Sequence, residues 1–123
     1  MILSREKLLA KEKLEIEKVQ LTKTEFVYVR QMTGRERDAF EQSCLKEVKH
    51  PGGKVEYKQS LTDFRAKLAV CTLSDKEGNA LLQPNDYTTL SQNMSAATLE
   101  KIVNVAQRLN KISEEDKDAL VKN

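Results

Sequence analysis

The chain has 123 residues, of which 39% are hydrophobic and 33% are charged. This length suits one domain with a modest core. Aromatic residues are scarce, and four glycines with two prolines are too few for a β-sandwich, which needs frequent turns. We therefore expect a mainly α fold, in which one small domain of about five or six helices spans residues 1–123 and carries an N-terminal β-hairpin.

The charge of the chain is nearly balanced, with a net value of +2 from 21 basic and 19 acidic side chains. Such a balance lacks the single-sign field of a dedicated nucleic-acid binder. The sequence has no run of 18 apolar residues and no secretory signal. We therefore expect the chain neither to span a membrane nor to be exported. Cys44 and Cys71 lie far apart without a CxxC motif, which is typical of a cytosolic protein with free thiols.

Candidate catalytic residues are few. His50 is the only histidine and lies in a stretch with Pro51 and two glycines that is typical of a loop. A catalytic pair of His50 with Cys44 or Cys71 remains an alternative, although both cysteines are predicted to face the core. The sequence contains no motif for a zinc site, a phosphate-binding glycine loop or a nucleophile elbow. We expect no enzyme activity, no metal and no cofactor.

The N-terminal third begins with a helix and continues with strands. Ser4 can cap a helix over Arg5–Glu12, whose apolar side is Leu8 and Leu9. Alternating apolar and polar residues, followed by a β-branched and aromatic run, then predict a hairpin from about Leu14 to Arg30.

A capping box marks the next helix. Thr33 and Glu36 have the spacing at which each side chain bonds the other's backbone N–H. The helix is predicted over Gly34–Val48, with Phe40 and Cys44 in its apolar stripe.

A polar stretch with a Pro-Gly-Gly sequence follows this helix. It predicts one mobile loop over Val48–Gln59, with its most flexible part at about residues 49–59. Ser60 can then cap a helix over Leu61–Leu73, in which apolar residues recur at helical spacing.

The C-terminal half is predicted to be helical. A turn over Asp75–Asn79 leads into the short apolar segment Ala80–Leu82, and Pro84 can open a short helix. The cleanest amphipathic pattern predicts a helix over Ala96–Leu109, whose stripe is either core or a partner-binding surface. Ser113 can cap a last helix with an acidic first turn.

Three segments in collinear order resemble the tail assembly chaperones of long-tailed (siphovirus-type) bacteriophages and prophages. Val27–Glu41 is similar to the family's VYVR-x-(L/M)-T-x-x-ERD-x-FE block. The other two segments are Phe64–Leu68 with Cys71 and Ser74–Gly78, and Leu99–Asn110 with Ser113–Asp116. The resemblance covers almost the whole chain, and the 48–59 stretch departs from it.

The resemblance implies a non-catalytic chaperone that binds the tape measure protein, keeps it soluble and promotes polymerisation of the tail tube around it. Such a protein acts in the host cytoplasm and is absent from the mature virion. A longer form, made by ribosomal frameshifting, would contact the tail tube protein. The alternative function is that of a small helical nucleic-acid-binding regulator.

The predicted partners follow from this reading. They are the tape measure protein, the tail tube protein and further copies of this chain, with no nucleic acid and no membrane among them. The open edge of the hairpin and the apolar side of the first helix are the predicted self-association surfaces. The arginines near residue 35 can form structural ion pairs or face a partner. The candidate partner-binding residues are Leu8, Leu9, Tyr28, Arg30, Arg35, Arg37 and Phe40.

Overall fold

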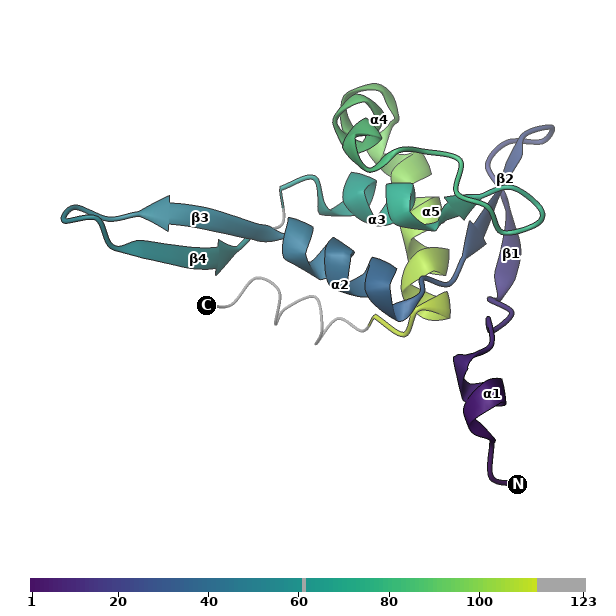
Figure 1. Ribbon diagram of the computed structural model, residues 1–123. Helices are drawn as coiled ribbons and strands as arrows, with labels where there is room; N and C mark the ends of the chain where they lie inside the picture. The colour runs from purple at the N-terminus through teal and green to yellow at the C-terminus, as the bar shows by residue number, and fades with distance from the viewer. Residues whose placement is uncertain (61, 113–123) are drawn as a thin grey trace.

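The structure is a computed structural model that describes residues 1–60 and 62–112 (Figure 1). Its elements, in chain order, are α1 (Arg5–Leu9), β1 (Ile16–Gln20), β2 (Phe26–Arg30), α2 (Gly34–Ser43), β3 (Leu45–Lys49), β4 (Val55–Gln59), α3 (Phe64–Thr72), β5 (Leu73–Ser74), the 3-10 helix η1 (Pro84–Asp86), α4 (Tyr87–Asn93) and α5 (Ala96–Leu109). The helix predicted after Ser113 lies outside the described residues.

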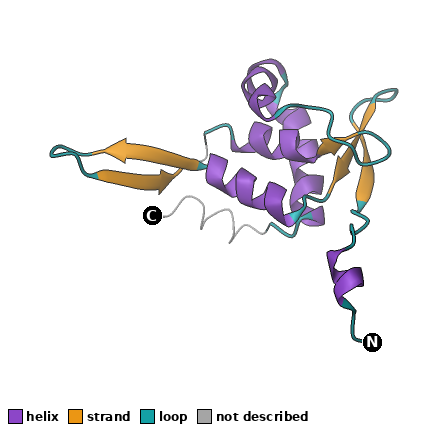
Figure 2. Ribbon diagram, viewed as in Figure 1, coloured by secondary structure: helices purple, strands orange, loops and turns teal. Residues whose placement is uncertain are grey.

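The expectation of a mainly α fold is wrong, because the described residues form two small sheets beside the helices (Figure 2). One sheet has the strand order β1-β2-β5, and the other is the β3–β4 hairpin. The chain is therefore a mixed α and β protein. Sequence reasoning found the first hairpin but missed β5, which has only two residues, and β3 and β4.

The predicted N-terminal hairpin is confirmed. β1 and β2 pair antiparallel, with Ile16 opposite Arg30 and Gln20 opposite Phe26. β5 adds to the other edge of β2, where Val29 lies opposite Leu73. Val29 is fully buried against the helices, and Arg30 beside it in β2 is also buried, whereas Tyr28 is half-buried and Phe26 is exposed.

The predicted helix over Ala96–Leu109 is confirmed with both bounds. Ser95 caps it, and the Ser95 side chain accepts a hydrogen bond from the backbone N–H of Thr98 at 3.1 Å. One side of the helix packs against α3 and the sheet and is buried in the core. The buried residues of α5 are Leu99, Ile102, Val103, Ala106 and Leu109.

The predicted capping box of α2 is also confirmed. The Thr33 side chain accepts the N–H of Glu36 at 3.2 Å, and Glu36 accepts the N–H of Thr33 at 2.9 Å. The predicted end of the helix at Val48 is wrong, because α2 ends at Ser43 and the chain enters β3 two residues later.

The stretch predicted as a mobile loop is the β3–β4 hairpin, which projects from the body (Figure 1). Its register runs from Leu45 opposite Gln59 to Lys49 opposite Val55. Gly52 and Gly53 have φ values of 93° and 84°, which lie in the left-handed region that glycine adopts freely. These two glycines close a turn rather than loosen the segment.

Helix α3 begins later than predicted. Its N-cap is Asp63 in a left-handed conformation, and Phe64 is its first residue. The hydroxyl of Ser60 accepts the N–H of Thr62 at 3.2 Å and so stabilises a local turn, not the helix. The proposed start at Leu61 lies outside the described residues. None of the helices within 1–60 and 62–112 combines the length and the apolar character needed to cross a membrane.

Candidate functional site

A groove of about 590 Å³ lies between α2, α3 and the segment that leads into α4. Its lining is mostly apolar in the middle and charged at both ends. We call it the α2–α3 groove. Its apolar lining includes Ala39, Phe40, Val70, Cys71, Leu82 and Tyr87.

Helical spacing explains why α2 and α3 face the groove together. Ala39 and Ser43 of α2 are four residues apart, as are Lys67 and Cys71 of α3, and residues at this spacing lie on one face. Phe40 is 1% exposed and belongs to the core beneath the groove. Its ring contacts Phe64 edge to face, with 5.5 Å between the ring centroids.

The third wall of the groove depends on β5. After this strand the chain turns back, and the N–H of Leu81 donates to the carbonyl of Leu73 at 3.3 Å. This bond holds the following segment against the body, where Leu82 packs against the core. Leu81 itself is exposed beside it.

An ion pair between the buried Arg30 and the half-buried Glu36 closes one end of the groove. Arg30 is 4% exposed, and its Nη1 and Nη2 donate to the two carboxylate oxygens of Glu36 at 2.9 and 2.7 Å. Arg30 Nη1 also donates to the carbonyl of Gln31 at 3.0 Å. The bonds from Arg30, together with the N–H of Thr33, hold the pKa of Glu36 down to about 2. The hydrogen bonds to the Glu36 carboxylate in turn raise the pKa of Arg30.

Lys67 closes the other end. Its Nζ donates to the carbonyl of Ser43 at 2.7 Å and lies 5.2 Å from the centroid of the Tyr87 ring. This one side chain therefore connects α3 to α2 and α4. Burial raises the pKa of Cys71, so its thiol is neutral at pH 7 and adds apolar surface to the groove. A groove with engaged charges at its ends and apolar walls suits an apolar polypeptide segment.

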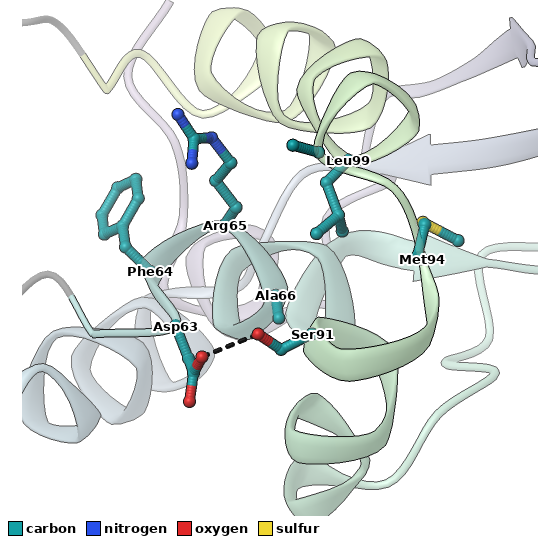
Figure 3. Close-up of a pocket in the computed structure, with 8 residues that line it drawn as sticks. Asp63, Phe64, Arg65, Ala66, Ser91, Met94 and Leu99 are labelled. Atoms are coloured by element: carbon teal, nitrogen blue, oxygen red, sulfur yellow. Dashed lines mark hydrogen bonds between the residues drawn. The ribbon is translucent and has the colours of Figure 1, made fainter.

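A second hollow of about 300 Å³ lies where the start of α3 meets α4 and α5 (Figure 3). Asp63 and Ser91 face each other across it, and the Ser91 hydroxyl donates to Asp63 Oδ1 at 2.7 Å. Arg65 also borders the hollow, and its Nε donates to Glu100 at 2.8 Å. Its charged groups are thus bonded within the protein. The larger α2–α3 groove is the better candidate for a partner.

Two of the predicted partner-binding residues, Arg30 and Phe40, lie together at the α2–α3 groove. Leu8 and Leu9 lie elsewhere, on α1, where they are 65% and 69% exposed. Helix α1 itself ends at Leu9, earlier than predicted, although Ser4 caps it as expected.

The other three predicted residues lie outside the groove. Tyr28 is half-buried on β2 and packs edge to face against Phe26. Arg35 is exposed on the first turn of α2. Arg37 forms an ion pair with Glu41 at 2.9 Å and donates to the carbonyl of Asn110 at 3.0 Å, which ties α2 to the end of α5.

Sequence reasoning missed Leu82 and Tyr87 as groove residues. The signal for Leu82 is the short apolar segment Ala80–Leu82 after the turn at residues 75–79, which has no helical or strand period of its own. Such a segment must pack on another element, but the sequence does not say on which one.

The β3–β4 hairpin carries a second distinctive surface. Lys46 lies directly opposite Lys58 in the register, and like charges at this position repel. His50 is on the same hairpin, and its Nε2 lies 2.7 Å from a carboxylate oxygen of Glu56. Tyr57 is 65% exposed. The hairpin is thus a basic projection with an exposed aromatic ring.

The described part of the chain has no group of three or more His, Cys, Asp or Glu side chains arranged to hold a metal ion. Comparisons with protein-family models, with curated proteins and with solved structures found no match to this chain.

Proposed function

We propose that this chain is a non-catalytic tail assembly chaperone of a long-tailed bacteriophage or prophage. In this role it binds the tape measure protein in the host cytoplasm, keeps it soluble and promotes polymerisation of the tail tube around it, and it is absent from the mature virion. A frameshifted longer form would recruit the tail tube protein, and copies of the chain would associate with one another.

The position of the α2–α3 groove is the observation that carries this proposal. Two of the segments that resemble the family, Val27–Glu41 and Phe64–Leu68 with Cys71, are separated along the chain but both line the groove. The first contributes Arg30 and Phe40, and the second contributes Lys67 and Cys71. A resemblance that converges on one apolar surface supports a binding role for that surface.

The physical chemistry of the groove suits such a client. A tape measure protein is long and helical, and its apolar side chains are uncovered until the tube encloses it. An apolar groove can cover one stripe of a client helix, as in other helix-in-groove complexes. Many weak contacts along one client give a high total affinity while each copy remains free to leave.

Co-expression with the tape measure protein of the same phage or prophage tests the proposal. We expect the tape measure protein alone to be largely insoluble and to become soluble with this chain. The Ala39→Lys variant should lose most of this effect, because it places a charge in the groove, whereas Gln42→Lys adds the same charge at an exposed position of α2 outside the groove lining. Unchanged solubility of the tape measure protein and its fragments would refute the function.

The basic hairpin favours one second candidate, a nucleic-acid-binding regulator. A two-stranded β-ribbon fits the major groove of DNA, and Lys46 and Lys58 would then contact phosphates. A DNA titration at two salt concentrations separates the candidates. Binding that weakens steeply with salt and is lost in the Lys46→Gln/Lys58→Gln variant supports the regulator, and no measurable binding at low salt discards it.

A further inference from the structure

The first nine residues form an exposed apolar arm, which we call the N-terminal arm (residues 1–9). Ile2 is 98% exposed, and Leu3, Leu8 and Leu9 are exposed as well. Helix α1 has no buried residue and stands away from the body (Figure 1). So many aliphatic side chains in water on one short segment indicate a surface that another surface covers.

The arm is shaped by local bonds and tied to the body at one point. The Ser4 side chain accepts the N–H of Lys7, and the Ser4 carbonyl accepts the N–H of Leu8 at 2.9 Å. The chain meets the body at Glu15, whose N–H donates to the side chain of Gln31 at 2.9 Å. The arm therefore has a defined helical turn and a fixed root, with its leucines unburied.

The same chain offers an apolar surface of matching kind. The α2–α3 groove has an apolar middle and a volume of about 590 Å³, which is in the range of pockets that enclose a ligand. We propose that the N-terminal arm of one copy docks in the α2–α3 groove of a second copy. Leu8 and Leu9 of the donor then cover Ala39 and Leu82 of the acceptor, which are accessible in the groove lining.

The arm stands away from the groove of its own chain, so the groove that it occupies belongs to a second copy. In its own chain α1 stands apart from the helices that line the groove, so a chain that donates its arm keeps an open groove (Figure 1). Donor and acceptor surfaces differ, which makes the contact heterologous. Such contacts repeat head to tail and build rings or open chains.

The contact between one arm and one groove is small and therefore weak. A standard interface uses about 20 to 30 residues on each side, and the arm has far fewer. A single arm in a single groove is therefore weak, and assembly should depend on concentration. This inference extends the self-association within the proposed function, and it places the neighbour's arm in competition with the client for one groove.

Complementation between two variants of the purified chain tests the inference without any client. Leu8→Glu/Leu9→Glu leaves the groove intact and disables the arm, whereas Ala39→Lys leaves the arm intact and blocks the groove. By sedimentation we expect the unaltered chain to grow in mean mass with concentration and each variant to stay monomeric. An equimolar mixture of the two should form one-to-one dimers and nothing larger.

Matched controls separate docking from charge and folding effects. Lys11→Gln/Lys13→Gln changes the net charge of the N-terminal segment by the same two units and should assemble like the unaltered chain. Gln42→Lys is the control for the groove variant. Deletion of residues 1–9 removes no buried residue and serves as a second acceptor-only chain. Circular dichroism verifies that each variant is folded.

Three results would overturn the inference. They are a monomeric unaltered chain at several hundred micromolar, assembly of either variant alone, and an arm whose amides are protected from hydrogen exchange in the monomer. The last result would mean that the arm covers its own groove. Client solubilisation is measured separately, so a failure here leaves the chaperone proposal standing.

Discussion

Replacement of Glu36 by glutamine should destabilise the protein in a pH-dependent way. Glutamine has nearly the same shape and can still accept the N–H of Thr33, so the capping box survives while the charge is lost. The change leaves Arg30, which is 4% exposed, without its carboxylate partner. A buried guanidinium that loses its partner is costly, so the variant isolates the ion pair.

The size of the effect follows from the pKa of Glu36, which falls from 4.5 to about 2, mainly through its hydrogen bonds from Arg30. One pKa unit corresponds to about 1.4 kcal/mol, so the shift gives an upper bound of about 3.4 kcal/mol. The Glu36 side chain is 37% exposed, so solvent screens the pair. We therefore expect a loss of about 2 kcal/mol at pH 7 after this discount.

The pH dependence has a definite direction. The pKa of Glu36 is lower in the folded chain than in the unfolded chain, so its carboxylate stabilises the fold above about pH 4.5. This contribution is lost as the pH falls toward 2. The free-energy difference between the unaltered chain and Glu36→Gln should shrink over that interval.

Urea unfolding at pH 7, 4.5, 3 and 2 measures this difference. Glu41→Gln is the matched control, because it removes a more exposed pair with Arg37 and should cost about 0.5 kcal/mol. Arg30→Met combined with Glu36→Gln should recover part of the loss, since no charge is then left unpaired. A difference that stays constant from pH 7 to pH 2 would refute the reasoning.

Two further predictions concern glycine positions and the β3–β4 hairpin. Gly78 has a φ of 91°, and a Cβ there would meet the Cδ1 of Ile16 at 3.1 Å, so Gly78→Ala should lower the free energy of unfolding by about 1 to 2 kcal/mol. Gly34 has open space and begins α2, so Gly34→Ala should leave stability unchanged or raise it by up to about 1 kcal/mol; equal effects in thermal melts would contradict this contrast. Apart from the exposed N-terminal segment before β1, trypsin should cut first at Lys54, beside the hairpin turn, and an earlier cut within α5 in a timed digest would show that the hairpin is the better protected element.

Elements with local signals could be predicted from the sequence. The capping box at Thr33 and Glu36, the Ser95 cap and the amphipathic stripe of α5 each depend on residues within one or two turns. Their chemistry is complete before the chain folds, so sequence reasoning located them. The N-terminal hairpin was found for the same reason, because its alternation and its turn are both local.

Elements that depend on distant partners could not be predicted. β5 has only two residues and exists because β2 offers a free edge opposite Leu73. Half of the residues of β3 and β4 are lysine or glutamate, which have low strand propensity, so the sequence of this hairpin resembles a loop. Helix α2 ends at Ser43 although its apolar spacing continues through Val48.

The residues of the α2–α3 groove show the same difference between local and distant determinants. Arg30 and Phe40 were predicted as partner-binding residues because their types and the family block drew attention to them. Leu82 reaches the groove through a chain reversal that β5 anchors, so no pattern in its neighbours could place it there.

The N–H of Ser60 donates to the carbonyl of Cys44 at 2.7 Å, so the two ends of the β3–β4 hairpin meet where it joins the body. A segment whose ends meet can be shortened, exchanged or enlarged without moving α2 and α3 apart. The turn at Gly52 and Gly53 is therefore a natural insertion point for a fluorescent protein. A chain labelled in this way would carry its label at the far end of the hairpin, away from both the N-terminal arm and the α2–α3 groove (Figure 1). Fluorescence could then follow the proposed self-association and the proposed client binding without a label on either surface.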